Sequence, residues 1–376
     1  MSKRLLLLGG GHAHVHVLQA LAREPLAGVE VALVTPYARQ MYSGMVPGLV
    51  AGHYGVNECA IALRPLAQAA GVHFVEGCAV ALDCSARRVT LTDGRVAGYD
   101  VLSFDTGAVM DRSRLDGALE HGLFVRPIEE FVQRLDSVWE LAARRVLDVV
   151  VVGGGAAGVE LALALEHRLA GRGEERARIA LVTGGAELLH GYARGVVQRA
   201  TAALARRRVT VIRDSCTALE AGSVLLGNGA RLACDVPVLA TGAEAPPWLA
   251  GSGLALDARG FIVTGPTLQS ASHPEVFAVG DVATRSDVAY AKSGVYAVRA
   301  GPALALNLRR HIAGGVLQRH RPPRNTLNLI SCGQKRAIVS WAALAAQGRW
   351  AWWWKDHIDR AFVRRYSEPL APKAGA

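Results

Sequence analysis

One glycine-rich pattern occurs twice in this chain of 376 residues, and it constrains the fold more than any other feature. In the first copy an apolar run ends at Gly9-Gly10-Gly11, and a later one ends at Thr106-Gly107-Ala108. In the second copy the same places hold Gly153-Gly154-Gly155 and Thr241-Gly242-Ala243, which lie 144 and 135 residues further along. Each copy also contains a dipeptide typical of β-hairpin turns: Asp93-Gly94 and Asn228-Gly229. The repeat predicts two similar α/β units.

An apolar strand pattern precedes each glycine turn, and a helical pattern follows it. At such a turn a pyrophosphate can approach the free N–H groups of the helix N-terminus. The first turn has only two glycines of the GxGxxG fingerprint, because His14 holds the third place, so we expect wider packing between helix and strand there. The second turn has all three: Gly153, Gly155 and Gly158. The sequence therefore predicts two dinucleotide sites, and two dinucleotides suggest electron transfer between them.

The rest of the pattern completes an α/β fold of two Rossmann-like dinucleotide-binding domains. A late apolar strand ends at Gly280-Asp281, and we expect Pro302 to interrupt the helix over 292–310. Shorter elements are expected as helices at 60–70 and 196–207, and as strands at 29–34, 72–75, 96–104, 179–182 and 209–212. A strand pair, 327–330 with 336–341, and a helical pattern through Tyr366 predict a small α+β segment at the end. We expect one discontinuous domain (1–112 and 246–313), a second domain inserted into it (113–245), and a C-terminal segment (314–376).

Positive charge and tryptophan are concentrated in the last 78 residues. From Arg299 onward there are 14 Lys or Arg and 3 Asp or Glu, whereas residues 1–298 hold 28 basic and 29 acidic residues. Five of the seven tryptophans also lie there: Trp341, Trp350, Trp352, Trp353 and Trp354. An anionic membrane surface attracts both indole rings and cations. A small core or a homodimer interface would use the same residues, so both explanations stay open, and we expect no nucleic-acid partner.

Targeting signals and cysteines indicate where such a protein works. The apolar run at 5–8 is too short for a signal peptide, and no apolar stretch reaches the length of a membrane span. The six cysteines are scattered without a CxxC pair, as is usual for reduced thiols. We expect a cytoplasmic protein, peripheral at most on the inner face of the cell membrane.

Two further patterns concern metal and nucleotide preference. His12, His14 and His16 follow the first glycine turn, but no carboxylate or cysteine accompanies them locally, so we expect no metal site. An acid that binds the ribose hydroxyls usually ends the second strand of a Rossmann unit. Thr35 and Thr183 stand in those places here, so the sequence does not choose between NADH and NADPH.

The chain resembles a known family in a series of ordered motifs: GGGHAHVHVL, YSGMVPGLVAGHY, DTG, VVVVGGGAAGVELALAL, ATG, VFAVGDVA and AKSGVYAVRAGPALALNL. They resemble the two-dinucleotide-domain flavoproteins of the pyridine nucleotide-disulfide oxidoreductase superfamily. Among these the chain is most similar to the type II NADH dehydrogenase-like group, and within it to the branch also found fused to selenophosphate synthetase (selenide, water dikinase). The resemblance covers essentially the whole chain. It implies FAD in the discontinuous domain and NAD(P)H in the inserted one.

The resemblance also implies roles for individual residues. Glu160 and Lys292 would be the catalytic candidates beside the nicotinamide and the flavin, and Asp281 would bind the ribityl chain of FAD. A helix that starts near Ser293 would point its positive end at the flavin edge where negative charge develops on reduction. The other residues implied in FAD binding are Gly9, Gly11, His12, Ala13, Thr35, Pro36, Ser43, Met45, Pro47, Val80, Thr106, Gly107, Gly280, Gly294 and Tyr296. Those implied in NAD(P)H binding are Gly153, Gly155, Ala156, Ala157, Gly158, Thr241 and Gly242.

The electron acceptor is left open by the sequence. A quinone would suit the basic, tryptophan-rich end, although residues 294–302 read GVYAVRAGP where the family has a glutamine-rich quinone segment. A dithiol relay is not expected, because Cys59 stands alone where disulfide reductases carry a CxxxxC pair. We expect an FAD-dependent NAD(P)H oxidoreductase that passes electrons to a quinone or another small acceptor. The alternatives are a reaction on a sulfur or selenium species, in which Cys332 would take part, and a slow-turnover flavin redox sensor or scaffold.

Overall fold

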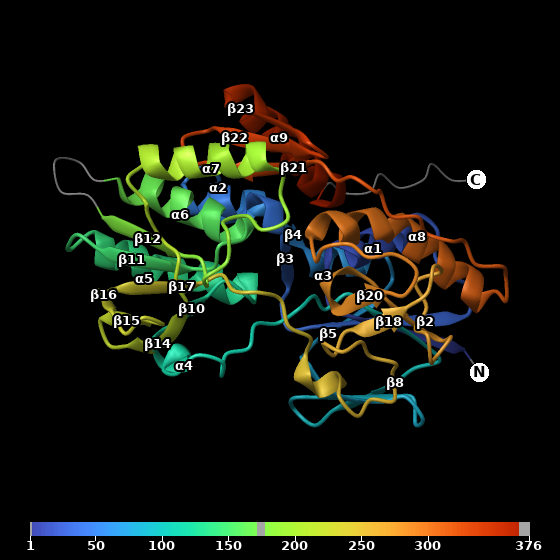
Figure 1. Cartoon of the computed structure of the whole chain (residues 1–376). Helices are drawn as coiled ribbons and strands as arrows, with labels where there is room; N and C mark the ends of the chain where they lie inside the picture. Colours follow the sequence, from blue (N-terminus) through green and yellow to red (C-terminus); the bar gives the residue numbers. More distant parts are fainter. Residues whose placement is uncertain (1, 171–176, 368–376) are drawn as a thin grey trace.

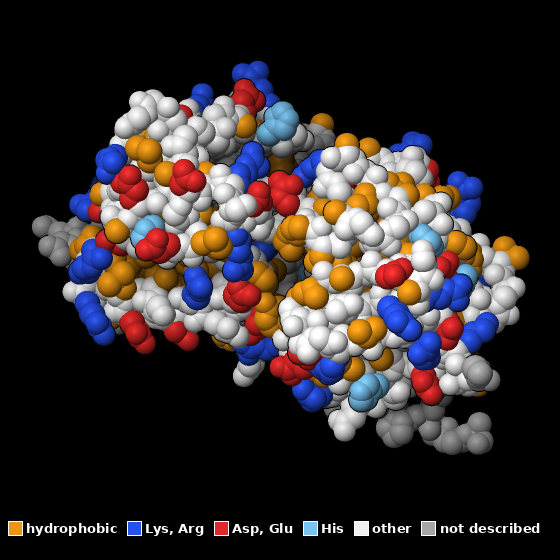
Figure 2. Space-filling model, turned by 90° about the horizontal axis from the view of Figure 1, so that it is seen from below, with side chains coloured by type: hydrophobic (Ala, Val, Ile, Leu, Met, Phe, Trp, Pro, Cys, Tyr) orange, Lys and Arg blue, Asp and Glu red, His pale blue; other side chains and the backbone are white. Residues whose placement is uncertain are grey.

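A computed structural model describes residues 2–170 and 177–367. The chain forms two α/β units side by side, and a small C-terminal segment covers the top of one of them (Figure 1). Seen from below, the two units form two lobes with acidic and basic side chains spread over both, and hydrophobic side chains gather where the lobes meet (Figure 2). None of the described helices has the length and apolar composition needed to cross a membrane.

The first unit is built on a five-stranded parallel sheet in the order β19-β9-β1-β2-β5. Its central strand, β1 (Lys3–Leu8), has four leucines that are at most 3% exposed, because helices or loops cover both faces of the sheet. The other strands are β2 (Val29–Thr35), β5 (His73–Glu76), β9 (Val101–Phe104) and β19 (Val276–Ala278). The helices of this unit are α1 (His12–Arg23), α3 (Leu63–Ala69) and α8 (Gly294–Ile312), whereas the short helix α2 (Val46–Val50) reaches across to pack on α6 (Ala156–Leu169) of the second unit (Figure 1). An antiparallel meander follows β5: β6 (Ala79–Asp83), β7 (Arg88–Leu91) and β8 (Val96–Gly98).

The second unit repeats this plan with the order β10-β17-β11-β12-β13. Its strands are β10 (Leu123–Phe124), β11 (Asp148–Val152), β12 (Arg178–Val182), β13 (Thr210–Ile212) and β17 (Val236–Leu239). Its helices are α4 (Ala118–His121), α5 (Ile128–Ala142), α6 (Ala156–Leu169) and α7 (Arg194–Arg206). Its meander consists of β14 (Cys216–Glu220), β15 (Ser223–Leu226) and β16 (Arg231–Ala233).

Equivalent hydrogen bonds confirm the repeat at the glycine turns. The Gly9 N–H donates to the carbonyl of Val34 at 2.8 Å, and the Gly153 N–H donates to that of Val182 at the same distance. The units differ in the source of their fifth strand: β10 precedes the second sheet in the chain, whereas β19 reaches the first sheet only after the second unit is complete. The first sheet is therefore built from two separate stretches of sequence.

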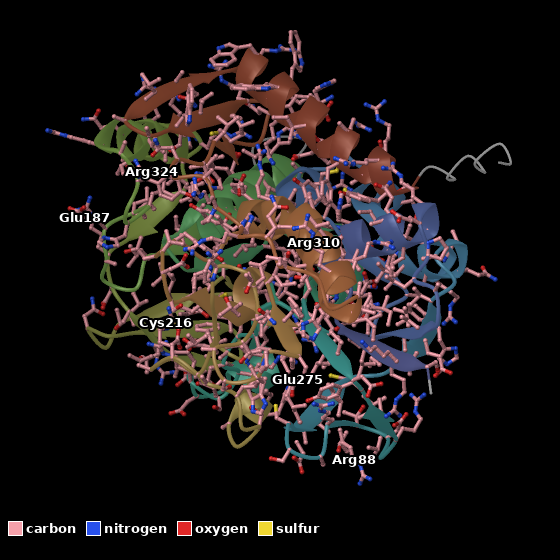
Figure 3. All side chains as sticks on the ribbon, turned by 90° about the vertical axis from the view of Figure 1, so that its right-hand side faces the viewer. Arg88, Glu187, Cys216, Glu275, Arg310 and Arg324 are labelled. Atoms are coloured by element: carbon pink, nitrogen blue, oxygen red, sulfur yellow. The ribbon has the colours of Figure 1, made fainter. Side chains whose placement is uncertain are left out.

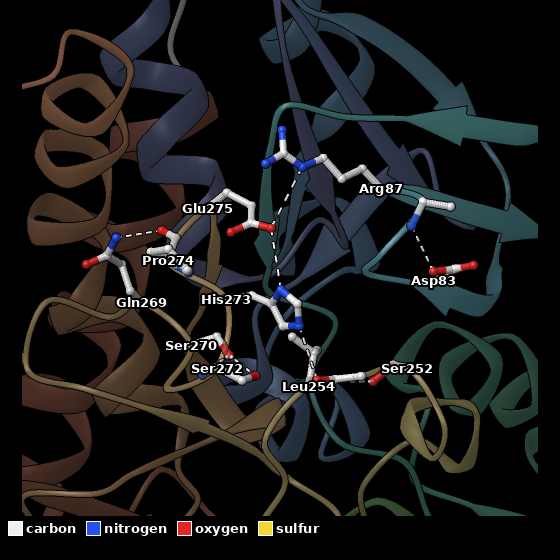
Figure 4. Close-up of polar contacts among 12 residues, drawn as sticks. Asp83, Arg87, Ser252, Leu254, Gln269, Ser270, Ser272, His273, Pro274 and Glu275 are labelled. Carbon is white, nitrogen blue, oxygen red and sulfur yellow. Dashed lines mark hydrogen bonds and ion pairs between the residues drawn. The ribbon is translucent and has the colours of Figure 1, made fainter.

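Polar contacts fix the returning chain beside β19 (Figure 4). Glu275 lies between Arg87, 3.9 Å from its Nε, and His273, 3.5 Å from its Nδ1, and the carbonyl of Glu275 accepts the Leu102 N–H at 3.0 Å. These contacts tie the β6–β7 hairpin to the returning segment. The smaller elements of this region are η3 (Pro247–Leu249), η4 (Gly280–Val282) and the parallel pair β18 (Ile262–Thr264) and β20 (Ala283–Arg285).

The C-terminal segment is an antiparallel sheet with one long helix. The strands are β21 (Asn328–Ser331), β22 (Ala337–Trp341) and β23 (Leu344–Gly348), and the helix is α9 (Arg349–Ser367). This segment packs on α6 and α7 at the top of Figure 1, and α9 runs on to α1. The predicted strand pair is confirmed, and β23 is an addition that the sequence analysis did not anticipate.

Three expected elements differ in the structure. The helix predicted at 60–70 begins only at Leu63, because residues 60–62 form a short strand, β4 (Ala60–Ala62), that pairs with β3 (Arg39–Met41) and buries Ile61. The strand predicted at 96–104 is divided into β8 and β9, which belong to different sheets. Helix α8 continues through Pro302, and Gly301 beside it lets α8 pack closely against His16 of α1. The loop region before β4 also contains η1 (Ser43–Met45) and η2 (Val56–Cys59).

Candidate active site

A cavity of about 1100 Å³ lies where the two units and the C-terminal segment meet. Its walls come from the second glycine turn, the turn at Ser43-Gly44, the start of α8, strand β21 and helix α9. Figure 3 labels two residues of the wall, Cys216 at the start of β14 and Arg324 shortly before β21. The cavity therefore connects a nucleotide-type turn in one unit with the helix start predicted beside the flavin in the other.

The second glycine turn fits a dinucleotide pyrophosphate. A Cβ at Gly158 would overlap the carbonyl oxygen of Gly153, so only glycine lets α6 pack this closely on the strand. At Gly155 the opposite holds, since no atom lies within 4 Å of a Cβ built there, and the residue faces the cavity. The N-cap residue of α6 is Gly155, so no side chain caps the helix N-terminus. The first turn of α6 also holds no acidic residue that would repel a phosphate. Ala156, Ala157, Thr241 and Gly242 line the same wall.

The three histidines of the first turn point to different partners. His12 lies 3.4 Å from Ser43 Oγ, His14 binds Gly9 and Ser103, and His16 lies 3.1 Å from Tyr366 Oη. Burial lowers the pKa of all three to about 4, so they are neutral at physiological pH. The described residues contain no group of three or more ligand-type side chains that could hold a metal.

The other residues expected at FAD surround the first turn. Asp281 follows Gly280 in η4 and pairs with Arg126 of the second unit at 3.0 Å, an ion pair that sequence reasoning missed. Thr35 is buried at the end of β2, whereas Pro36, Val80 and Thr106 are exposed. Gly107 and Ala13 lie on the same side of the sheet, at the carboxyl ends of β9 and β1. Ligands of such sheets bind at the carboxyl ends of the parallel strands, so FAD binding by these residues stays a prediction.

The loop at 43–48 is only partly at the cavity. Ser43 lines the cavity, but Met45 and Pro47 are buried in the core. Ser43 faces the start of α8, where a Cβ on Gly294 would lie 3.1 Å from its Oγ. Helix α8 begins at Gly294, and Ser293 takes the N-cap position without capping the helix through its side chain. The positive end of the helix thus opens onto the cavity, and its placement at the flavin edge stays a prediction.

Lys292 and Tyr296 are anchored within the second half of the first unit. The Lys292 ammonium donates to the carbonyl of Ala283 and to Thr284 Oγ1, and lies 3.8 Å from the centre of the Phe261 ring. Burial lowers the pKa of Lys292 to about 8. Tyr296 stacks on Tyr290 with ring centres 4.2 Å apart. The ammonium group is thus held against the 283–284 backbone, and a catalytic role for Lys292 stays a prediction.

Glu160 lies at the cavity beside charges that come from the C-terminal helix. Its Oε1 accepts the Ser331 N–H at 2.7 Å, and burial raises its pKa to about 7, while the charge of Lys355 acts in the opposite direction. Lys355 is itself buried and donates to the carbonyl of Gly44 at 2.6 Å and to Asp359 at 2.8 Å. Tyr42 hydrogen-bonds the same Asp359, whose pKa is raised by burial.

Sequence reasoning did not find Tyr42, Lys355 and Asp359. Lys355 and Asp359 are four residues apart on a predicted helix, and this spacing was the available signal for the pair, but ion pairs of this kind are usually solvent-exposed. Here it is buried because α9 is pressed against the turn at Ser43-Gly44. The three residues form a hydrogen-bonded group on the cavity wall.

The six cysteines are free thiols. Cys332 is 5% exposed, and burial raises the pKa of its thiol to about 12. Its Sγ lies 3.7 Å from the carbonyl of Ile330. A thiol of this kind is a poor nucleophile at neutral pH, because the thiolate is the reactive form.

Most of the C-terminal tryptophans are on the surface. Trp352 is buried and lies parallel to Tyr54, with the two ring centres 6.3 Å apart. The other large side chains of this segment are 39–66% exposed and form what is here called the tryptophan patch: Trp341, Leu344, Trp350, Trp353, Trp354 and Ile358. Ile358 also lines the cavity, so the patch adjoins the cavity mouth.

Comparison with known proteins agrees with this geometry. The sequence profile described as pyridine nucleotide-disulphide oxidoreductase matches residues 3–305. Demethylphylloquinone reductase NdbB of Synechocystis sp. is 28% identical over 299 residues, which cover 76% of this chain and 72% of that protein.

Solved structures share the fold over nearly the whole chain. A sulfide:quinone oxidoreductase from Aquifex aeolicus aligns with a TM-score of 0.79 and 18% identity, over 97% of this chain and 92% of its own. NDH2 from Plasmodium falciparum in complex with NADH aligns with a TM-score of 0.78 and 12% identity, over 98% of this chain and 99% of its own. The chain belongs to the pyridine nucleotide-disulphide oxidoreductase family, whose members bind FAD and NAD(P)H.

Proposed function

We propose that this protein is an FAD-dependent NAD(P)H dehydrogenase that reduces a quinone-type acceptor at a membrane surface. The observation that carries the proposal is the single cavity shared by the second glycine turn, the start of α8 and the C-terminal segment. When bound, FAD supplies an isoalloxazine that takes a hydride from the nicotinamide and gives the electron pair to an acceptor. The chain has to hold the two nucleotides in contact, exclude water and supply protons.

The second unit would hold NAD(P)H at the open N-terminus of α6. The space in front of Gly155 leaves the first N–H groups of the helix free for the pyrophosphate. Glu160, one turn further along α6, would lie beside the nicotinamide. The start of α8 would stabilise negative charge on the flavin edge that faces it.

The acceptor would meet Tyr42, Lys355 and Asp359. Reduction of a quinone to the quinol needs protons as well as electrons, and these residues form a hydrogen-bonded group at the cavity. Lys355 Nζ can hold a proton there, and Asp359 can receive one in its place because burial raises the carboxyl pKa. The relative named demethylphylloquinone reductase supports a quinone as acceptor.

The tryptophan patch would bring the cavity mouth to the membrane. Four exposed tryptophans, each 43–58% exposed, lie on one small segment that also carries most of the excess positive charge of the chain. Indoles favour the headgroup region and cations favour anionic lipids. The inner face of the cell membrane is therefore the proposed location. The alternative is that the tryptophan patch forms the interface of a homodimer.

The second candidate function is a reaction on a sulfur or selenium species. It is suggested by the proposed membership in the branch of the family that includes fusions to selenophosphate synthetase. It would need a reactive thiol at the flavin, and Cys332 is buried with a raised pKa. A slow-turnover redox sensor would be distinguished by flavin that is reduced by NADH but is not reoxidised by any small acceptor.

Anaerobic stopped-flow spectroscopy tests the reaction. Reduction of the flavin by NADH or NADPH is followed first, and the reduced protein is then mixed with a short-chain quinone or with selenite. Sulfide can only donate electrons, so it is mixed with the oxidised protein instead. Lys355→Met should leave reduction by NADH unchanged and slow reoxidation by the quinone about 100-fold, the range for loss of a general acid. The matched control is Lys335→Met, which removes an exposed lysine of the same segment. A colourless protein after addition of FAD, or a Lys355→Met protein with normal reoxidation, would contradict the proposal.

Vesicle sedimentation tests the location. The full chain should sediment with vesicles that contain anionic lipid, and less with purely zwitterionic vesicles or at high salt. Replacing Trp350, Trp353 and Trp354 by serine should abolish sedimentation without changing reduction by NADH. If the variant instead changes from dimer to monomer in size-exclusion chromatography and still sediments, the patch is a subunit interface.

A further inference from the structure

The two glycine turns differ at a pair of positions that correspond in the repeat. His14 in the first unit stands where the second has Gly158, and Asp105, the last residue before Thr106-Gly107, stands where the second has Ala240. In the second unit the missing side chain of Gly158 lets α6 rest on the Gly153 carbonyl. The first unit cannot use this packing, because its helix carries an imidazole at that point.

His14 makes up for the lost contact with two hydrogen bonds. Its imidazole is fully buried, with Nδ1 2.6 Å from the carbonyl of Gly9 and Nε2 2.8 Å from Ser103 Oγ. Because a carbonyl only accepts, Nδ1 must carry the proton, and Nε2 then accepts from the Ser103 hydroxyl. The neutral ring thus joins the glycine turn to β9 in a fixed tautomer.

Asp105 occupies the other side of the same helix end. Its carboxylate is 3% exposed, and one oxygen accepts the N–H groups of Ala13 at 2.7 Å and His14 at 2.9 Å. A Cβ on Gly11 would overlap this carboxylate, and one on Gly280 would lie 3.0 Å from it. Two glycines of the predicted FAD cradle are therefore packed directly against Asp105.

Among the residues that the structure describes, no cationic side chain pairs with Asp105. His12 and His14 on α1 are neutral, and Asp281 on η4 faces Asp105 and is paired with Arg126. Burial raises the pKa of Asp105 to about 7, although the hydrogen bonds from the His14 and Ala13 N–H groups lower it; the charge of Asp281 adds to the effect of burial. A bound pyrophosphate would add further negative charge at this helix end, which favours the protonated carboxyl.

We propose that His14 and Asp105 together replace the packing glycine of the FAD turn, and that Asp105 takes up a proton from solvent when FAD binds. The inference rests on the proposed FAD site in the first unit. It goes beyond that site by making FAD retention depend on pH through one residue that does not touch the reacting atoms. Asp105 and His14 are thus positioning residues.

Dilution of the holoenzyme at a series of pH values, with free FAD measured by its fluorescence, tests the proton step. The Kd for FAD should rise with pH above about 7, approaching tenfold per pH unit, because one proton has to be bound with FAD. Asp105→Asn should make the Kd independent of pH between 6 and 9, since its side chain does not titrate. A wild-type Kd that does not change with pH would overturn the proton step, and so would an Asp105→Asn protein with the wild-type slope. If Asp105→Asn folds but holds no FAD, the wild-type slope alone decides.

The packing role has its own matched pair on α1. His14→Ala removes both hydrogen bonds and should raise the Kd for FAD about tenfold or more. His16→Ala removes a histidine of the same helix whose hydrogen bond goes to Tyr366 instead, and should leave the Kd within about twofold. Equal Kd values for two folded variants would overturn the role of His14. A wild-type protein that binds no FAD at all would refute the proposed function rather than this inference.

Discussion

Gly155→Ala is the substitution that most directly tests the proposed NAD(P)H turn. A Cβ at this position meets no atom within 4 Å, so the fold should not change, but it would enter the space in front of the α6 N-terminus. A pyrophosphate there would lose one hydrogen bond, worth about 1.5–3 kcal/mol when one partner is charged. The Kd for NADH should therefore rise about 10- to 150-fold. The maximal rate of flavin reduction should change little, because the substitution is far from the nicotinamide in the proposed arrangement.

Gly158→Ala is the matched control in the same turn. Its Cβ would overlap the Gly153 carbonyl, so α6 must move away from β11, at a cost of about 1–3 kcal/mol in the free energy of unfolding. We expect a lowered melting temperature for Gly158→Ala and an unchanged one for Gly155→Ala. The assays are differential scanning calorimetry and stopped-flow reduction over a range of NADH concentrations. A Gly155→Ala protein that binds NADH like the wild type would refute the placement of the pyrophosphate.

Three further outcomes follow from the structure. Burial raises the pKa of Glu160 to about 7, so ionisation destabilises the fold as pH rises through that value; the melting temperature of Glu160→Gln should exceed that of the wild type more at pH 8 than at pH 6. Gly184→Asp places a carboxylate after β12, at an open position with a φ of +75° that aspartate tolerates better than most residues. An acid at the end of this strand binds the ribose hydroxyls of NADH, so steady-state kinetics should show about a tenfold shift in kcat/KM toward NADH over NADPH. In urea unfolding, Trp352→Ala should cost about 3–5 kcal/mol and Trp353→Ala less than about 0.5 kcal/mol, because only the first is buried; equal losses would contradict the assigned core.

The main features of the fold could be predicted from local sequence patterns. The glycine turns, apolar strands and hairpin dipeptides determine each unit by short-range rules, and α1 follows the first glycine turn directly, as its helical pattern predicts. The short strand β4 could not be predicted, because the apolar pattern around Ile61 is compatible with a helix as well as with a strand. Its strand conformation depends on pairing with β3, which lies elsewhere in the sequence. The separation of β8 from β9 likewise depends on which sheet accepts each piece.

The candidate site shows the same limit. The turn of Gly153, Gly155 and Gly158 could be predicted because it depends on local backbone geometry, and the structure has it between β11 and α6. Lys355 and Asp105 were not found, because each acts through contacts with residues more than 80 positions away in the sequence, such as Gly44 and Ala13. Charge at such positions becomes informative only when the packing of distant elements is known.

The late arrival of β19 has a consequence for synthesis of the chain on the ribosome. Until residues 276–278 emerge, β9 is an unpaired edge of the first sheet, and unpaired edges of this kind invite pairing with other chains. The inserted unit has all its strands earlier and can fold while the first is still incomplete. Nascent chains released before residue 276 should therefore be prone to aggregate through the first unit, although the second is already native-like in them.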